Sequence, residues 1–276
     1  MDSVTTTPDD RRRCRVLGIP VDACRDVQAA AIGIHARGGG RIVSLNAEMT
    51  MTARSLPELG HAIEGADLVI PDGAGVVWAL ARQRVSVVKT AGIALAWTLL
   101  EFAAAHSWRV ALVGAAPAVM DILCQSLPQR LPGLNLVMAV DGYQPADAWD
   151  GIEAELHQLN PDLVLVALGV PRQETWSERV SESRSGLWMG VGGSFDVWAG
   201  VKRRAPAWMC RYRIEWLYRL IQEPSRWRRM LSLPASPGLS CGVADQRKPT
   251  EACQTKARSR KKTGISGRMS ISGEKA

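Results

Sequence analysis

The sequence predicts a Rossmann-like α/β domain, a mostly parallel, twisted sheet with helices on both faces, followed by a C-terminal helical arm. Two observations predict this fold class. Short β-branched or apolar runs alternate with amphipathic stretches along the chain, as in successive strand–helix–strand units. The composition, 46% hydrophobic and 22% charged over 276 residues, allows a sizeable core and excludes collagen-like, wholly disordered and membrane-embedded classes.

Strands and helices are expected in strict alternation, joined by right-handed crossovers. The apolar and β-branched runs predict strands at Arg15–Ile19, Arg41–Leu45, Asp67–Ile70, Arg109–Val113, Leu134–Val140, Asp162–Leu168 and Trp188–Val191. The amphipathic stretches predict helices near 25–37, 55–64, 75–83, 92–106, 117–128, 147–159 and 171–183. No internal repeat and no linker interrupts this series, so the body is expected to be one domain.

Four segments are expected along the chain. They are a disordered N-terminus (1–14), the α/β body (15–206), an Arg/Trp-rich helical arm (207–234) and a disordered basic tail (235–276). The N-terminus has no apolar signal segment, and no apolar run reaches the ~20 residues of a membrane span. The six cysteines form no CxxC pair, which indicates reduced thiols and a cytoplasmic location.

Positive charge is concentrated in the C-terminal third. The formal net charge is +7, yet residues 201–230 hold nine basic against two acidic residues, and residues 241–276 hold nine against three. Four of the ten tryptophans lie between Trp198 and Trp227. Arginine suits phosphates and tryptophan suits a membrane interface, so the arm is interpreted either as a packed amphipathic helix or as a membrane-facing, diphosphate-binding element. The two interpretations are compatible.

Polar and glycine-rich residues follow the expected strands. In open α/β sheets, ligands bind beyond the carboxyl ends of the strands, so these residues are expected to converge on one crevice. They are Ser44, Asn46, Asp72, Gly114, Tyr143, Gln173 and Ser194. The turn from Gly114 to Pro117 resembles a phosphate-binding turn at a helix start. Asp72 is interpreted either as a catalytic base or as the cap of the helix that follows Gly73.

Several common catalytic motifs are absent. The dinucleotide fingerprint GxGxxG, the Walker lysine and HExxH do not occur. No DxD pair occurs, so no metal ion is expected. The four histidines are scattered, which is typical of surface or helix positions.

Six sequence blocks resemble, in order, those of the WecG/TagA/CpsF glycosyltransferases, a family that includes N-acetylmannosaminyltransferases. The resemblance covers roughly residues 15–233. The blocks are SLNAEM (44–49), ADLVIPDGAGVVWA (66–79), VALVGA (110–115), PDLVLVALGVPRQETW (161–176), GVGGSFDVWAGVKRRAPAW (190–208) and EWLYRLIQEPSRWRRM (215–230).

The resemblance implies an inverting, metal-independent transfer of a hexose-type sugar from a UDP-sugar to a polyprenyl-diphosphate-linked amino sugar, without a cofactor. It implies a role in cell-wall polymer or surface polysaccharide synthesis at the inner face of the cytoplasmic membrane. The family's proposed general base falls on Asp72. Its substrate-binding positions fall on Ser44, Asn46, Gln173, Arg219, Arg226 and Arg229. Arginines match phosphate oxygens in planar, bidentate pairs, which fits a transferase without a metal.

One family block departs from its usual form. Arg-x-x-Gly-x-Asp-Leu is usual, and here Lys89 and Ala94 stand at the arginine and aspartate positions. Lysine keeps the charge but loses bidentate binding, and Ala94 removes a carboxylate. The donor sugar and the acceptor therefore stay open.

The sequence leaves two other function classes open. One is a catalytically silent relative that acts as a nucleic-acid- or membrane-binding module through the basic third of the chain. No RNP, helix-turn-helix or zinc pattern supports it, so no nucleic-acid partner is expected. The other is a nicotinamide-dependent enzyme, disfavoured by the missing fingerprint.

Overall fold

The computed structural model describes residues 11–87, 90–181 and 185–203, together with Pro206, Met209 and Tyr218. The chain divides into two units, Met1–Cys241 and Gly242–Ala276, and every described residue belongs to the first. The expected tail lies outside the described residues, as does the expected arm except for Met209 and Tyr218.

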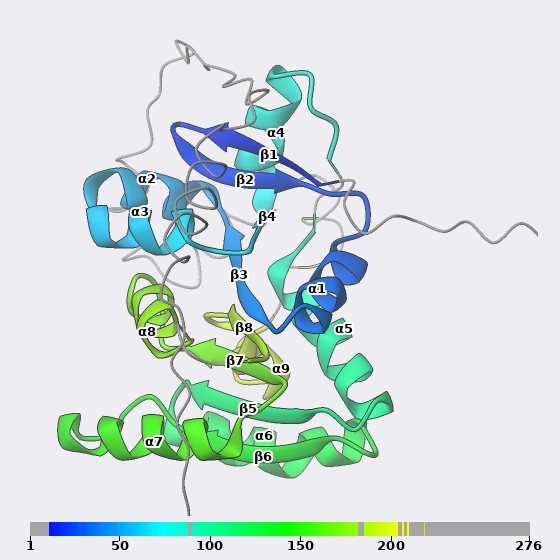
Figure 1. Ribbon diagram of the computed structural model, residues 1–276. Helices are drawn as coiled ribbons and strands as arrows, with labels where there is room; N and C mark the ends of the chain where they lie inside the picture. Colours follow the sequence, from blue (N-terminus) through cyan, green and yellow to red (C-terminus); the bar gives the residue numbers. More distant parts are fainter. Residues whose placement is uncertain are drawn as a thin grey trace, which may run out of the picture. The chain divides into compact units, whose positions relative to one another are not determined.

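The fold is α/β and is built on one parallel sheet, which confirms the predicted class (Figure 1). Its six strands are β3 (Gly40–Leu45), β4 (Leu68–Pro71), β5 (Arg109–Gly114), β6 (Asn135–Val140), β7 (Leu163–Ala167) and β8 (Leu187–Gly190). Their order is β4-β3-β8-β7-β5-β6, and all five pairings are parallel. Each strand lies within one residue of its predicted range at both ends.

Helices connect the strands. They are α1 (Val27–Ala36), α2 (Ala47–Ser55), α3 (Pro57–Glu64), α4 (Gly73–Arg82), α5 (Gly92–Ala105), α6 (Pro117–Arg130), α7 (Trp149–Leu159), α8 (Arg172–Ser181) and α9 (Ser194–Trp198), with a 3₁₀ turn, η1 (Ala146–Ala148). None of the helices that the structure describes is long and apolar enough to span a bilayer.

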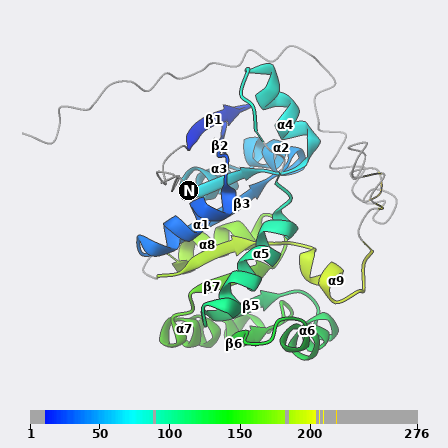
Figure 2. The same cartoon turned by 90° about the vertical axis from the view of Figure 1, so that its right-hand side faces the viewer.

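Successive side chains of each strand point to opposite faces of the sheet, and each face is packed in a hydrophobic core. On one face, α1, α5, α6 and α9 pack over Leu112, Leu165 and Met189. On the other face, α7 and α8 pack over Val113 and Val166, and Figure 2 shows α7 and α6 on opposite sides of β5 and β6. A third cluster packs α2, α3 and α4 on β3 and β4. Because both faces are covered, the strands are nearly continuous apolar runs, which is what made them visible in the sequence.

Two aspartates that directly precede strands fix the opposite end of the sheet. Asp67 accepts a hydrogen bond from the backbone N–H of Arg41 at 2.8 Å, and Asp162 accepts one from the N–H of Arg109 at 2.8 Å. Each therefore satisfies a donor of the strand beside its own. The same Asp-Leu-Val sequence stands at both places.

The predicted first strand, Arg15–Ile19, is wrong. The structure has a β-hairpin there, β1 (Arg12–Val16) and β2 (Ile19–Ala23), which forms an antiparallel two-stranded sheet apart from the main one. Leu17 and Gly18 form the turn with φ of 54° and 86°, the left-handed values that a tight hairpin turn requires. Since β1 begins at Arg12, the body starts before the predicted boundary at residue 15.

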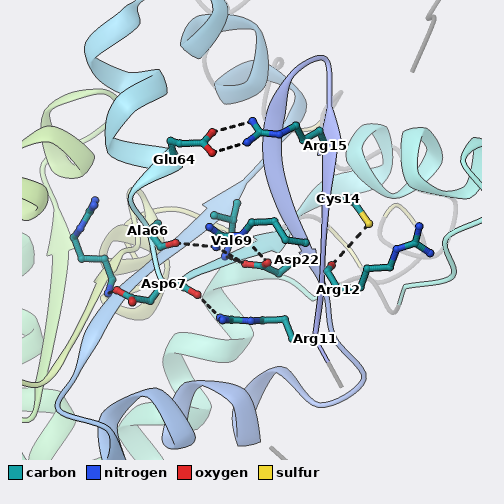
Figure 3. A network of polar contacts seen from close by, with 11 residues as sticks. Arg11, Arg12, Cys14, Arg15, Asp22, Glu64, Ala66, Asp67 and Val69 are labelled. Atoms are coloured by element: carbon teal, nitrogen blue, oxygen red, sulfur yellow. Dashed lines mark hydrogen bonds and ion pairs between the residues drawn. The ribbon is translucent and has the colours of Figure 1, made fainter. Parts of the chain in front are cut away.

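A buried carboxylate joins the hairpin to edge strand β4 (Figure 3). Asp22 is 1% exposed and accepts hydrogen bonds from Arg13 (2.9 Å) and from the backbone N–H of Val69 (2.8 Å). Arg13 also donates to the carbonyl oxygen of Ala66 at 2.8 Å. The side chain of Asp22 thus accepts a hydrogen bond from the N–H of Val69, which would have no partner at an uncovered sheet edge.

Two helices were missed by the sequence analysis. Helix α2 carries three threonines or serines on nine residues, so its apolar periodicity is weak. Helix α9 has only five residues. It is held by Arg130, which donates to the carbonyl oxygen of Trp198 at 3.1 Å and lies 4.2 Å from the ring centre of Trp97.

Replacing Asp22 by Asn should destabilise the protein by about 2 kcal/mol, because the amide nitrogen would replace Oδ1, which accepts from Arg13 Nε at 2.9 Å, and would set a buried donor against a donor. The free energy of unfolding from urea denaturation measures this. Glu64→Gln is the matched control, because Glu64 and its partner Arg15 are 50% and 43% exposed. An exposed pair contributes less than about 1 kcal/mol. Equal losses in the two variants would contradict a special role for the buried carboxylate.

Candidate active site

A cleft of about 950 Å³ runs along the carboxyl edge of the parallel sheet. Residues that follow all six strands line it, together with the first turns of the helices that begin there. Six of the seven residues expected to converge are among them: Ser44, Asn46, Asp72, Tyr143, Gln173 and Ser194. The prediction of one crevice is therefore confirmed as geometry, since residues from β4 at one edge to β6 at the other share it.

Gly114 differs from the other six. Its neighbours Ala115 and Ala116 line the cleft, whereas Gly114 has φ +114° and faces β7. A Cβ atom there would lie 2.5 Å from the carbonyl oxygen of Ala167. Glycine is thus required for the packing of β5 on β7, and a role in phosphate binding stays a prediction.

Asp72 is the central carboxylate of the cleft. It occupies the position before α4, yet its side chain makes no capping hydrogen bond to that helix. Its Oδ2 atom accepts from Ser44 Oγ at 3.1 Å and from the backbone N–H of Gly92 at 3.4 Å. Of the two interpretations of Asp72, the geometry thus disfavours the helix cap. The carboxylate is held by β3 and by the N-terminus of α5.

Gly92 makes this arrangement possible. A Cβ atom at Gly92 would lie 2.4 Å from Ser44 Oγ, closer than any side chain can approach. Gly92 opens α5, and in the sequence only its place in the family block with Lys89 and Ala94 marks it. The close approach of Gly92 in α5 to Ser44 in β3 joins residues that are far apart in the sequence, so local sequence does not reveal it.

Asn46 is the N-cap of α2. Its Oδ1 atom accepts from the backbone N–H of Met49 at 2.9 Å. This bond fixes the side chain and uses its carbonyl oxygen, so the amide nitrogen is the group that is left for a ligand. An Asn before an unrecognised helix was the signal that could have identified α2.

Gln173 joins two loops of the cleft. It is 3% exposed, and its Oε1 atom accepts from the backbone N–H groups of Gly169 and Gly192, both at 3.2 Å. Gly169 follows β7 and Gly192 follows β8. The side chain therefore sets the spacing of the two strand ends at the middle of the sheet.

Glu174 lies directly behind Gln173 and was not singled out from the sequence. It is 4% exposed, and its Oε1 atom accepts from Gln173 Nε2 at 2.7 Å. Burial raises the pKa of Glu174 to about 7, because the charged form loses its hydration, while the bond from Gln173 lowers it by a smaller amount.

The far rim of the cleft carries Tyr143 and Arg172. Tyr143 is 76% exposed, and its backbone N–H is bound by Asp141 at 2.8 Å. The guanidinium of Arg172 lies 4.8 Å from the ring centre of Trp149. An exposed aromatic ring and a cation at one rim suit a flat, polar ligand group.

Two cations reach the cleft from the chain after α9. Lys202 and Arg203 line it, and Lys202 is paired with Asp196 at 3.1 Å. Tyr218, inside the expected arm, also lines the cleft and directly precedes Arg219. The predicted diphosphate ligands Arg219, Arg226 and Arg229 lie outside the described residues, as does Lys89. Within the described ranges, no three His, Cys, Asp or Glu side chains gather as a metal site requires.

The fold and the cleft define an α/β protein whose candidate site lies at the carboxyl edge of a parallel sheet, with Asp72, Glu48 and Asp196 as its carboxylates. The chain belongs to the WecG/TagA/CpsF glycosyl transferase family, whose model matches residues 14–249. It is thus a glycosyltransferase.

Two curated relatives carry the same description, N-acetylglucosaminyldiphosphoundecaprenol N-acetyl-beta-D-mannosaminyltransferase. The protein of Bacillus spizizenii (strain W23) is 36% identical over 202 residues, which cover 71% of this chain and 76% of the relative. That of Bacillus subtilis (strain 168) is 33% identical over 199 residues, which cover 71% and 77%.

Gly92→Ala should lower kcat/KM for glycosyl transfer by about 10- to 100-fold, because the new methyl group displaces Ser44 from Asp72 by a large fraction of an ångström. The backbone of Gly92 is compatible with alanine, so the loss of stability should be only that of the clash with Ser44, about 1–3 kcal/mol. Gly151→Ala, inside α7 with nothing within 4 Å of the new Cβ, is the control. It should keep full activity and gain about 0.5–1 kcal/mol in stability. Full activity of Gly92→Ala would show that the Ser44–Asp72 contact is dispensable.

Proposed function

We propose that this enzyme transfers a hexose-type sugar, N-acetylmannosamine or a related sugar, from a UDP-sugar to a polyprenyl-diphosphate-linked amino sugar, in cell-wall polymer or surface polysaccharide synthesis. The observation that carries the proposal is Asp72: it faces a large cleft and does not cap its helix. The names of the two relatives support an acceptor of the undecaprenyl-diphosphate-linked N-acetylglucosamine type.

In the proposed reaction, Asp72 is the general base. The acceptor hydroxyl oxygen forms a bond to the anomeric carbon of the donor sugar, and the bond from that carbon to the diphosphate breaks. The proton of the hydroxyl passes to Asp72, and the electron pair of the broken bond leaves with UDP. Attack from the face opposite the diphosphate inverts the anomeric centre. Hydrogen bonds from Ser44 and Gly92 to Oδ2 leave Oδ1 for the acceptor.

The leaving diphosphate develops negative charge that the enzyme must stabilise. Lys202 and Arg203 supply cations at the cleft, and the N-terminus of α6 lies directly after the lining residues Ala115 and Ala116. In this proposal the arginines Arg219, Arg226 and Arg229 complete the set, because their planar forks bind phosphate oxygens bidentately. Tyr218 supports it, since it already lines the cleft.

The lipid-linked acceptor places the enzyme at the inner face of the cytoplasmic membrane as a peripheral protein. The Trp/Arg-rich composition of the arm supports this location. Residues 207–234 would then contact the membrane surface and the diphosphate together, since the acceptor joins a membrane anchor to a phosphate group.

Asp72→Asn should lower kcat by about 10²–10⁴-fold, because a neutral amide cannot take the proton of the acceptor. The affinity for UDP, measured by calorimetry, should stay within about twofold, because Asn keeps the size and hydrogen-bonding shape of the side chain. Asp26→Asn is the matched control, because Asp26 is an N-cap whose side chain accepts from Ala29, and Asn caps equally well. Near-normal turnover of Asp72→Asn would refute the general base.

A chain ending at residue 206 should lose transfer activity and bind anionic vesicles more weakly than a chain ending at 234. Both keep β1–β8 and α1–α9, so both should show the same cooperative unfolding of the body. Charge-driven binding is screened over a Debye length of ~8 Å at physiological salt, so vesicle binding should fall as salt rises. Loss of activity already in the 1–234 chain would assign these functions to residues beyond the arm.

A further inference from the structure

A buried polar pair lies under the middle of the cleft. Gln173 and Glu174 are 3% and 4% exposed, and Glu174 Oε1 accepts from Gln173 Nε2 at 2.7 Å. Both residues lie in the first turn of α8. A Cβ atom at Gly190 would lie 2.6 Å from Gln173 Nε2 and 3.0 Å from Glu174 Oε1, so the end of β8 packs directly on the pair.

The contacts on both sides of Gln173 permit only one orientation of its amide. Two backbone N–H groups, of Gly169 and Gly192, point at one end of the amide, and that end must be the acceptor oxygen. The nitrogen then points at Glu174, which must present an acceptor. If Glu174 were replaced by an apolar residue, the buried N–H of Gln173 would lose its partner, and the reversed amide would place two donors against two donors.

The environment of Glu174 disfavours a negative charge. Its Oε2 atom is buried and has no hydrogen-bond partner among the described residues. No cation of the described chain pairs with it. Ser177, one turn further along α8, also has a buried oxygen without a partner in that part of the chain. A carboxylate that is buried without a cation costs far more free energy than a buried carboxylic acid, even one whose O–H has no partner.

The charged groups on the elements that pack against α8 are occupied elsewhere. Glu178, four residues along the helix, is bound by Arg41 of β3 at 3.5 Å and by His61 of α3 at 3.1 Å. On α8 itself, Arg179 binds Glu153 of α7, and Arg172 lies over Trp149. On β7 and β8 no charged side chain is present. Among the carboxylates that line the cleft, Asp72 precedes α4 and is bound by Ser44, and Asp196 of α9 is paired with Lys202.

We propose that Glu174 is a positioning residue of the active site, which works as a neutral carboxylic acid. Its Oε1 atom orients the amide of Gln173, and that amide holds the glycine loops after β7 and β8 at the spacing that forms the cleft. In the neutral state Glu174 adds no negative charge to the cleft in which the donor diphosphate is proposed to bind. The effect on donor binding rests on the proposed function, whereas the protonation state of Glu174 does not.

Ionisation of Glu174 should weaken donor binding. The raised pKa of about 7 means that the side chain loses its proton as the pH passes neutrality. The new charge repels the diphosphate, so the KM for the UDP-sugar should rise by about three- to tenfold between pH 6 and 8.5. The effect on kcat should be smaller, since Asp72 carries the proton transfer.

The experiment compares Glu174→Gln with Glu174→Ala in the full chain. The glutamine variant is always neutral and still presents an acceptor to Gln173, so it should restore most of the UDP affinity that the alanine variant loses. Its UDP affinity and KM should also stay flat as the pH rises above 7. Glu178→Gln is the matched control from the same helix, and it should keep the pH dependence of the wild type. His61→Asn is a second control, because histidine also changes its charge near neutral pH.

Two readouts do not depend on activity. Carbon-13 NMR of labelled glutamate carboxyl groups should show one resonance, absent from Glu174→Gln, that titrates near pH 7. Between pH 4.5 and 7 the folded wild type keeps a proton that the unfolded chain has released, so its Tm relative to Glu174→Gln should fall as the pH rises through this window. It should be constant above this window.

If the carboxyl resonance that is absent from Glu174→Gln titrates near pH 4.5 in the wild type, the proposal is overturned. The proposal is also overturned if Glu174→Gln binds UDP as poorly as Glu174→Ala. Donor binding would then require the ionised form of Glu174. If the wild type binds no UDP at all, the proposed function fails, and the NMR titration and the Tm series still decide whether Glu174 is neutral.

Discussion

The shape of the cleft depends on the side-chain amide of Gln173, which accepts hydrogen bonds from two backbone N–H groups at the carboxyl edge of the sheet. Parallel strands end in loops whose N–H groups have no partner in the next strand, and a buried N–H without a partner costs about 1–3 kcal/mol. Gln173 satisfies two of them, on Gly169 and Gly192, and so ties the loops after β7 and β8 together. Gly190 must lack a side chain for the amide to fit. The spacing of the loops after β7 and β8, which form the middle of the cleft, is therefore set by this contact.

The sequence predicted the six strands of the main sheet and the crevice at their carboxyl ends. Both successes have one physical cause. Strands covered on both faces are apolar throughout, so their ends are marked by the first polar or glycine residue, and in a parallel sheet these ends meet at one edge. Ser44, Asp72 and Gln173 were therefore identifiable before any contact was known. That Asp72 bonds to Ser44 and Gly92, and not to its own helix, depends on the distance between β3, β4 and α5, which local sequence does not contain.

The elements that escaped prediction are those whose signals are weak or tertiary. The hairpin requires Leu17, a residue that rarely adopts positive φ, in a left-handed turn, so the run from Arg15 to Ile19 looked like one strand. Its place at the edge of the sheet depends on Asp22, whose partner Val69 is 47 residues away. Glu174 looked like an ordinary charged residue at a helix start. Only its 4% exposure and its bond to Gln173 distinguish it.

Ala94 stands where the family block usually has an aspartate, and the contacts of α5 explain why an alanine fits there. Ala94 is exposed and lies two residues into α5, beyond the lining residues Gly92 and Ile93, so an aspartate there would stand at the helix N-terminus and outside the cleft lining. The first turn of α5 contains no acidic residue and its N-cap makes no side-chain bond. Asp72 supplies the missing negative charge from another strand, through the N–H of Gly92. The positive end of a helix attracts a nearby carboxylate, and the N–H of Gly92 points at Asp72. The alanine thus removes a competitor for the positive end of α5 and leaves Asp72 as its acidic partner among the described residues.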